Sequence, residues 1–328
     1  MRIPKNVMVI ILNHNSGQLA NQLWDYISIY AYCLEKKFEC RNYCFFEYSK
    51  YFSMPVKNIF IDIIFYKSFS IACLFLPANF IKKAWRKIYK AYSSAIKILH
   101  PDSIIYSRTT KDSLGSYALP PSAQSTQELR RLEKGDKKNI YFDGWLFRNT
   151  VGIINYRDEI IKYFKPRKDI LKNVKNFINP IKNKFKILIG VHVRQKDYKN
   201  FKNGRFFVDQ KRARDIINEY INVFQINKKE ACFIICSDDS IDENMFSGLN
   251  IAISHNNLIE DLFILASCDI ILGSDSTFGS LASYFGNISH VIFKKDKIDW
   301  AYYEDKKQYF NNKYCLSVCN DNSLWSGY

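Results

Sequence analysis

Residues 185–198 read Phe-Lys-Ile-Leu-Ile-Gly-Val-His-Val-Arg-Gln-Lys-Asp-Tyr, an apolar run that becomes polar at its carboxyl end. A near-continuous apolar run of this length is typical of a strand buried on both faces of a parallel sheet. Because side chains alternate along a strand, His192 and Arg194 should share one face while Val193 packs on the other. The stretch predicts a buried sheet with a charged carboxyl edge.

The chain on either side of this strand alternates apolar runs with amphipathic stretches. Further strands are expected at 7–12, 139–144, 231–237, 269–273 and 291–293, and helices at 21–36, 209–224, 260–267 and 277–285. This alternation predicts an α/β fold with parallel, doubly wound sheets, whose ligands bind beyond the carboxyl ends of the strands. The Lys- and Asn-rich stretch 166–184, interrupted by Pro180, is interpreted as the domain boundary. We therefore expect domains at 1–178 and 179–328.

An insertion is expected at about 56–136 of the N-terminal domain. Its first part is aromatic and then strongly basic, whereas 102–136 is rich in Ser, Pro and Gln and is expected to be a long loop. Interior charges and Pro77 argue against a membrane-spanning helix. Two interpretations of 56–99 remain open: peripheral contact with an anionic membrane, or helices packed on the core with solvated lysines.

Composition narrows the class of protein without deciding it. The 328 residues are 47% hydrophobic and carry a formal charge of +16, which excludes a disordered chain and predicts an anionic partner. No nucleic-acid recognition module is present, so we expect no nucleic-acid partner. Nine scattered cysteines, and the short apolar run at 7–12 where a secretory signal would need a longer one, favour a reducing, cytoplasmic location.

Three strand ends in the C-terminal half carry polar residues. Arg194 can grip a phosphate with two parallel hydrogen bonds, or pair with a local Asp. Asp238 and Asp239 can bind a metal or a ribose, although capping of the next helix is the default. The loop 273–280, Gly-Ser-Asp-Ser-Thr-Phe-Gly-Ser, would let an anion approach a helix N-terminus, although Ser276 or Thr277 could be an ordinary N-cap. Together these ends predict a nucleotide-diphosphate pocket that needs no metal.

Four motifs in order also resemble those of the α-1,2-fucosyltransferases of glycosyltransferase family 11. They are Gly17-Gln-Leu-Ala-Asn-Gln22, His192-Val-Arg-Gln-Lys-Asp-Tyr198, Ser237-Asp-Asp239, and Asp261-Leu-Phe followed by Asp275-Ser-Thr-Phe278. The resemblance implies a GT-B architecture, with two Rossmann-like parallel-sheet domains facing across a cleft. It implies inverting transfer of L-fucose from GDP-fucose to a hydroxyl, the 2-OH in an α-1,2 linkage, with no cofactor or metal.

Residue roles follow from the same resemblance. Arg194 would hold the diphosphate, His192 and Asp197 would shape its pocket, and Asp238 and Asp261 would contact the nucleoside. Phosphate donors would come from Ser276, Thr277 and Phe278, and the lip of the N-terminal domain from Gly17, Asn21 and Gln22. Asp197 is also the nearest candidate for a general base, which would make it catalytic together with Arg194.

The sequence departs from the family pattern at three positions. Gln195 and Lys196 replace an arginine and a glycine, and Asp275 replaces an asparagine. Two alternatives therefore stay open: a GT-B transferase that uses another nucleotide sugar, and a nucleotide-binding homologue without activity. The expected acceptor is a surface-glycan oligosaccharide, such as one on a lipid carrier at the inner face of the cytoplasmic membrane.

Overall fold

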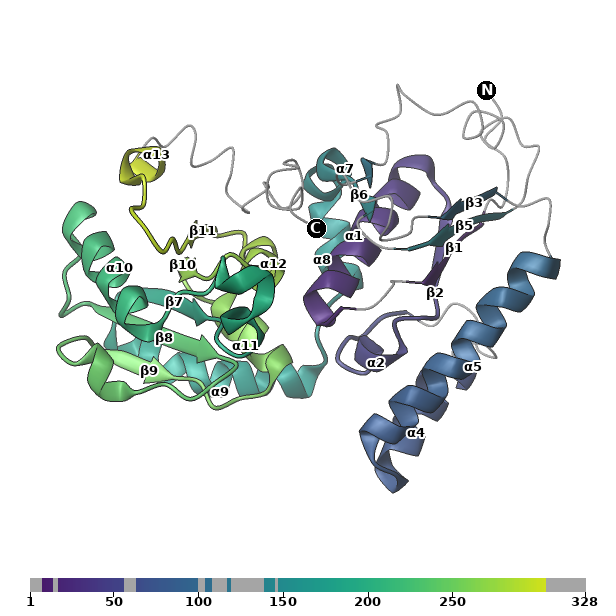
Figure 1. The fold of residues 1–328 in the computed structure, drawn as a ribbon, viewed down its shortest axis with the longest axis horizontal. Coiled ribbons are helices and arrows are strands. Elements are labelled where there is room, and N and C mark those ends of the chain that lie inside the picture. The colour runs from purple at the N-terminus through teal and green to yellow at the C-terminus, as the bar shows by residue number, and fades with distance from the viewer. Residues whose placement is uncertain are drawn as a thin grey trace. The chain divides into compact units, whose positions relative to one another are not determined.

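The computed structural model describes residues 8–13, 17–55, 63–99, 104–107, 117–118, 139–144 and 147–304. The chain forms two compact units that divide between Pro166 and Arg167 (Figure 1). Each unit contains a parallel sheet with helices packed on it. The predicted α/β fold class with parallel sheets is confirmed.

The N-terminal unit is built on a four-stranded parallel sheet of order β2-β1-β5-β3. Its strands are β1 (Met8–Asn13), β2 (Glu39–Asn42), β3 (Ile104–Ser107) and β5 (Asn139–Asp143). Helix α1 (Leu19–Lys36) joins β1 to β2 and is buried along most of its length. Lys37 ends the helix in a left-handed conformation, with φ of 57°. Strand β1 and helix α1 therefore correspond to the strand expected at 7–12 and the helix expected at 21–36.

Shorter elements complete this unit. They are α2 (Phe46–Ser49), the π-helical turn η1 (Ile63–Lys67), α4 (Ser68–Phe75), α5 (Ala78–Leu99), β4 (Tyr117–Ala118), β6 (Phe147–Arg148), α7 (Thr150–Asn155) and α8 (Arg157–Tyr163). Within the expected loop 102–136, residues 104–107 instead form strand β3, because their backbone pairs in parallel with β5 at the edge of the sheet. Residues 108–116 and 119–138 lie outside the described part of the chain.

The C-terminal unit has a five-stranded parallel sheet of order β11-β10-β7-β8-β9. Its strands are β7 (Ile187–Val193), β8 (Ala231–Ser237), β9 (Ile251–Ile253), β10 (Ile270–Gly273) and β11 (Ser289–Ile292). The central strand β7 lies between β10 and β8, and six of its seven residues are buried. The apolar run at 185–193 is therefore the middle of the sheet, as its composition predicts.

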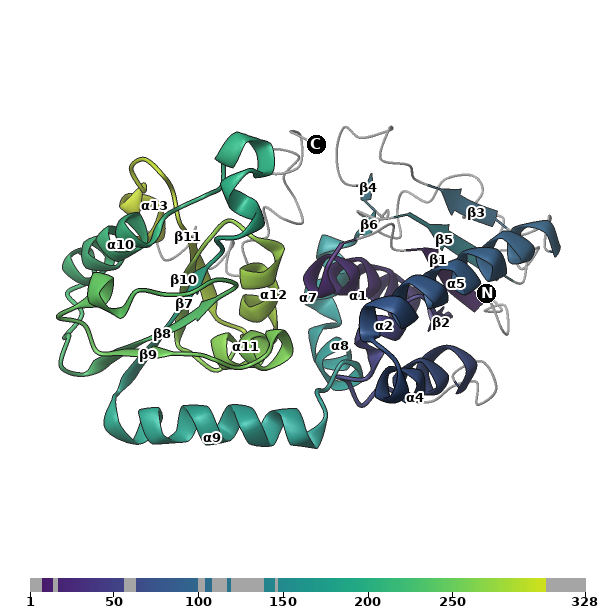
Figure 2. The ribbon, with the colours of Figure 1, turned by 60° about the horizontal axis from the view of Figure 1, so that its bottom comes forward.

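Helices cover both faces of this sheet (Figure 2). They are α9 (Lys168–Lys184), α10 (Gln210–Val223), α11 (Leu258–Leu265), α12 (Thr277–Gly286) and α13 (Trp300–Glu304). Val191 and Val193 share a core with Ile217 of α10. On the other face Gly190 lets α11 approach, since a Cβ there would lie 3.0 Å from the Leu265 side chain. The alternation of side chains along β7 thus produces a doubly wound unit.

The stretch 166–184 differs from expectation, because most of it is helix α9. Ile170, Val174 and Ile178 recur every fourth residue and are buried, while Lys and Asn residues cover the outer side. The helix packs on α11 and β7 and belongs to the C-terminal unit. The boundary expected between residues 178 and 179 falls inside this helix, and the unit begins at Arg167. Among the described helices, none combines the length and apolar character that a bilayer crossing requires.

Candidate nucleotide-sugar site

Arg194 lies just beyond the carboxyl end of β7 and is held by two carboxylates. Its Nε donates to Oδ1 of Asp197 at 2.8 Å and its Nη2 donates to Oδ2 at 2.9 Å. The Nε atom is also 3.2 Å from Oδ2 of Asp238. Burial lowers the pKa of Arg194, but the Asp197 hydrogen bond and the Asp238 charge outweigh it and raise the pKa overall. The local ion pair left open by the sequence is therefore formed, with the guanidinium in a fixed orientation.

The same pairing changes Asp197. Burial tends to raise the pKa of this carboxyl, but the hydrogen bond and charge of Arg194 outweigh burial and lower it. A carboxylate with a lowered pKa is a weak proton acceptor near neutral pH. The geometry therefore suits Asp197 to positioning Arg194 better than to general-base catalysis.

Asp238 follows β8, which lies beside β7 in the sheet. Its Oδ1 accepts from the backbone N–H of Gln195 at 2.7 Å and from that of Lys196 at 3.4 Å. The default interpretation, that this carboxylate caps the next helix, is wrong. Asp242 caps the short turn at Glu243–Phe246 instead, accepting from the N–H of Asn244. Asp238 ties the loop after β7 to the end of β8, because it can accept from N–H groups and from Arg194 together.

The amino end of α12 lies beside this loop. Ser276 is its N-cap, with Oγ accepting from the N–H of Phe278 at 3.1 Å, so the N-cap interpretation holds. Ser274 Oγ accepts from the N–H of Arg194 at 2.9 Å. Tyr198 donates its hydroxyl to the carbonyl of Asp275 at 2.9 Å. Two hydrogen bonds therefore join the Arg194 segment to the loop that begins α12.

His192 lies under α12 and does not add charge to the site. It is buried, its ring centroid lies 5.1 Å from that of Phe278, and its Nδ1 has no hydrogen-bond partner among the described residues. Burial, and then the charge of Arg194, lower its pKa to about 3. Gly273 lies directly opposite on β10, where a Cβ would be 3.0 Å from Cβ of His192. The neutral imidazole supports the floor of the site by packing.

Asp261 lies in the first turn of α11. Its Oδ1 accepts from the Oγ of Ser254 at 2.5 Å, and burial raises its pKa to about 6. The helix begins with a capping box formed by Asn257 and Glu260, which fixes the position of this turn. Asp261 is therefore a buried, oriented hydrogen-bond acceptor near the ends of β8 and β9.

Four residues that were assigned no role in the sequence contribute to the arrangement. Ser274 and Tyr198 provide the two connecting hydrogen bonds, and Gln195 is buried and donates its amide to the carbonyl of Val208 at 2.9 Å. Burial raises the pKa of Asp275 to about 6, although Lys294 and Arg205 oppose that shift. All four lie in or beside the quoted motifs, but spacing alone does not show their partners.

The three N-terminal motif residues come together at the start of α1. Gly17 has φ of +107°, and a Cβ there would lie 3.0 Å from Cβ of Asn21. Gln22 donates its amide to the carbonyl of Gly17 at 3.0 Å. This turn requires glycine, because the left-handed φ disfavours other residues. The role of these residues as a lip of the donor site stays a prediction.

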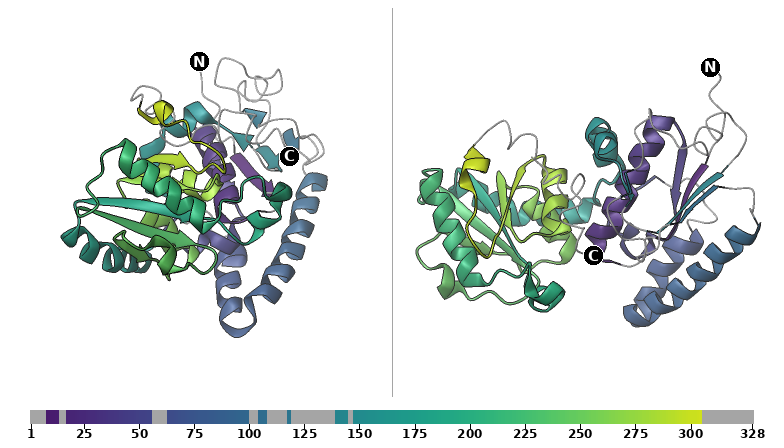
Figure 3. Two further views of the ribbon diagram at one scale, coloured as in Figure 1. Left: turned by 60° about the vertical axis from the view of Figure 1, so that its left-hand side comes forward. Right: turned by 45° about the horizontal axis from the view of Figure 1, so that its top comes forward.

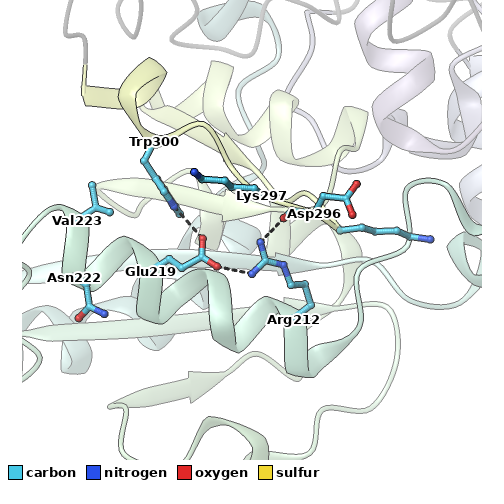
Figure 4. Close-up of a pocket in the computed structure, with 8 residues that line it drawn as sticks. Arg212, Glu219, Asn222, Val223, Asp296, Lys297 and Trp300 are labelled. Atoms are coloured by element: carbon cyan, nitrogen blue, oxygen red, sulfur yellow. Dashed lines mark hydrogen bonds and ion pairs between the residues drawn. The ribbon is translucent and has the colours of Figure 1, made fainter.

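A separate cavity of about 690 Å³ lies in the C-terminal unit between α10 and the segment after β11 (Figure 4). Arg212 in its wall pairs with Glu219 at 2.5 Å, and Trp300 donates to the same carboxylate at 2.9 Å. None of the predicted site residues lines it. Within the described ranges, no group of three or more His, Cys, Asp or Glu residues is arranged to hold a metal ion.

Comparison with known proteins shows the fold. No protein-family profile and no curated protein sequence matches the chain. The structure resembles that of POFUT1 in complex with GDP-fucose, with 13% identity and a TM-score of 0.51 over 88% of this chain and 99% of that one. It also resembles a substituted FUT1 from Arabidopsis thaliana in complex with GDP, with 12% identity and a TM-score of 0.50 over 89% and 72% of the two chains. The chain thus has the α/β fold of GT-B fucosyltransferase structures.

Proposed function

We propose that this protein is an inverting glycosyltransferase that moves L-fucose from GDP-fucose to a hydroxyl of a glycan acceptor. The observation that carries the proposal is the placement of Arg194 beside the amino end of α12, connected through Ser274 and Tyr198. A guanidinium and a helix N-terminus both favour the negative charge of a diphosphate. The motif resemblance and the shared fold support GDP-fucose as the donor.

In the proposed complex, Arg194 faces the diphosphate. Its Nε and Nη2 are engaged by Asp197, whereas Nη1 makes no hydrogen bond to any described residue. Nη1 can therefore donate to a phosphate oxygen while the carboxylate keeps the fork oriented. Ser276 and Thr277 supply donors at the helix start, where the N–H of Phe278 already donates to Ser276 Oγ. Asp238 and Asp261 accept from the nucleoside.

The reaction forms a bond from the acceptor oxygen to the fucose anomeric carbon and breaks the bond from that carbon to the diphosphate. GDP leaves with the bonding electrons, and the proton of the acceptor hydroxyl passes to solvent water. Arg194 and the α12 N-terminus stabilise the growing charge on GDP. This arrangement supplies positive charge without a required metal. Asp197 acts by holding Arg194.

The family and the linkage that we propose rest on the sequence motifs. We propose membership of the α-1,2-fucosyltransferase family, with transfer to the 2-OH of a galactoside in a cytoplasmic surface-glycan precursor carried on a lipid. Gly17, Asn21 and Gln22 would lie on the acceptor side of the donor. The alternatives are use of another nucleotide sugar, or nucleotide binding without catalysis. Both alternatives are compatible with Asp275, because its carboxyl group lies just before the turn that is proposed to bind phosphate.

Thermal unfolding with GDP, UDP and ADP separates these alternatives. A ligand present at 100 times its Kd adds about 2.7 kcal/mol to the free energy of unfolding. We expect protection by GDP, and GDP release from GDP-fucose that depends on acceptor. Stronger protection by UDP or ADP would favour another donor, and protection by GDP without transfer to any glycan offered would favour the inactive homologue.

The Arg194→Ala variant tests the site itself. We expect transfer to fall by at least about 10²–10³-fold while the protein stays folded. Arg167→Ala is the matched control, because Arg167 makes the same two-hydrogen-bond pair with Asp169, at 3.0 Å and 3.0 Å, on the exposed start of α9. Unchanged turnover in Arg194→Ala would remove Arg194 from the mechanism.

A further inference from the structure

Helices α4 and α5 form an antiparallel hairpin on the N-terminal unit, with Leu76 and Pro77 at the turn. Figure 3 shows the hairpin in blue, with its turn projecting beyond the strands of that unit. One side of the hairpin is packed. Phe65, Phe69, Ile81 and Tyr89 form a cluster with Phe46 of α2. The hairpin is therefore anchored, as expected for helices packed on the core.

An ion-pair network fixes the same side. Glu47 of α2 is buried, and its two carboxylate oxygens lie 2.6 Å from Nζ of Lys82 and 2.6 Å from Nε of Arg86. Lys97, at the far end of α5, pairs with Asp143. Each of these three basic residues is paired with a carboxylate of the protein itself, so its charge is less available to a partner.

The opposite side carries large apolar side chains in solvent. At the turn, Leu74 is 79% exposed, Phe75 is 80% exposed and Phe80 is 63% exposed. Ile88 and Ile98 of α5 are also exposed. Isolated exposed apolar residues are common, but a group at a projecting turn marks an interaction site.

Basic residues flank this apolar group. Lys83, Lys87 and Lys90 are exposed on α5 and have no acidic partner among the described residues. The segment 63–99 contains no Asp or Glu at all. On a helical wheel, a stripe of apolar or small residues lies next to the stripe that contains the lysines. The stripe consists of positions 80, 84, 88, 91, 95 and 98. A helix with an aromatic buried side, a basic side and an apolar exposed side fits an interface between water and lipid.

We propose that the α4–α5 hairpin docks the protein on an anionic lipid bilayer. Leu74, Phe75 and Phe80 would enter the acyl boundary while Lys83, Lys87 and Lys90 contact lipid headgroups. Charge complementarity favours lipid over a second copy of this chain, because two copies facing each other would bring the same unpaired lysines together. The inference concerns the N-terminal unit alone and does not depend on the identity of the donor.

Vesicle sedimentation with the full-length protein tests this proposal. The probes are vesicles of phosphatidylcholine alone and of phosphatidylcholine with phosphatidylglycerol, at about 0.15 M and about 1 M salt. We expect binding to the anionic vesicles at the lower salt, and much weaker binding at high salt or without the anionic lipid. Failure of the wild-type protein to bind anionic vesicles at the lower salt would overturn the proposal.

Two variant sets, each with a matched control, assign the surface. Replacing Lys83, Lys87 and Lys90 by Gln should weaken partitioning about a hundredfold, whereas the same change at the exposed Lys168, Lys172 and Lys175 of α9 should cost much less. Replacing Leu74, Phe75 and Phe80 by Ser should weaken it by at least about tenfold per side chain. The control is Ser at the exposed Ile154 and Met245.

Folding and donor binding are measured on every variant. We expect unchanged thermal unfolding and unchanged protection by GDP, because all the substituted side chains are exposed and none belongs to the proposed donor site. Equal vesicle binding by hairpin and control variants would overturn the proposal. A concentration-dependent dimer that the Ser variants abolish, without vesicle binding by the wild type, would identify a second copy as the occupant and also overturn it.

Discussion

Arg194 and Asp197 form two parallel hydrogen bonds across one turn of chain, at 2.8 Å and 2.9 Å. This pair fixes the plane of the guanidinium before any ligand arrives. A fixed donor loses less conformational entropy on binding than a free side chain does. The pair therefore connects the polar end of β7 with the chemistry proposed for it.

Replacing Asp197 by Asn tests positioning against base catalysis. Asn keeps one acceptor but loses the charge and one of the two parallel hydrogen bonds, so we expect kcat/KM to fall about tenfold. Because the proposal gives Asp197 no proton-transfer role, the pH profile should keep its shape. Loss of the acidic limb in the variant would instead make Asp197 the general base.

Substitutions of Asp238 separate its two contacts. Asp238→Asn keeps an acceptor for the N–H of Gln195, whereas Asp238→Ala leaves that N–H without its partner, at a cost of about 1–3 kcal/mol. We therefore expect the free energy of unfolding to fall more for Ala than for Asn in denaturant titrations. Equal destabilisation would show that Asp238 stabilises the protein through its ion pair with Arg194 and not through the loop hydrogen bond.

Tyr198 offers a test of the connection between Arg194 and α12. Tyr198→Phe removes the hydroxyl that donates to Asp275 and keeps the ring 5.7 Å from the guanidinium. The free energy of unfolding should fall by about 1 kcal/mol. Tyr198→Leu removes the ring as well and should reduce GDP protection further. If Phe and wild type melt alike, the hydroxyl does not hold the loop.

Asp261→Asn should raise stability near neutral pH. Burial raises the pKa of Asp261 from 3.8 to about 6, so the folded state binds its proton more tightly than the unfolded state. Stability from this group is complete below about pH 4 and is lost as the pH rises to about 6. Asn still accepts from Ser254, so the variant should gain about 3 kcal/mol over wild type at neutral pH and little at pH 4. GDP protection should decrease if Asp261 contacts the nucleoside.

His290 and His192 predict sensitivity to acid. Burial lowers the pKa of His290 to about 4 and that of His192 to about 3, both from 6.5. Below pH 6.5 the unfolded state binds protons that the folded state does not, so each histidine reduces stability by up to about 1.4 kcal/mol per pH unit. His290→Gln should therefore lose less Tm between pH 6.5 and pH 4 than wild type. Parallel Tm curves for the two proteins would contradict the shift.

The long apolar or periodic segments were predictable. Strand β7 follows from its apolar run, and α10 from the recurrence of Ala213, Ile217 and Tyr220 on one side. Helix α9 was not recognised, because Lys and Asn dominate its composition and Pro180 interrupts it, although Ile170, Val174 and Ile178 carried the signal. Strand β3 has only four residues, which is too few to show a period.

The site was predictable as a set of strand ends but not as a network. The alternation of side chains along β7 predicts that His192 and Arg194 share one face. Burial nevertheless makes His192 a neutral packing group, whereas Arg194 stays charged. The contacts of Ser274 and Tyr198 depend on how separate loops meet, which no local pattern in the sequence contains. The exposed side of α5 was likewise not predictable, because periodicity indicates an amphipathic helix but does not show which side packs on the rest of the protein.

The position of α9 decides how this protein should be dissected. A fragment starting at residue 179 would delete Ile170, Val174 and Ile178 and uncover part of α11 and β7, inviting aggregation. A fragment starting at Arg167 keeps that helix with the sheet it covers. Expression trials, isotope labelling and crystallisation of the C-terminal half should therefore begin there.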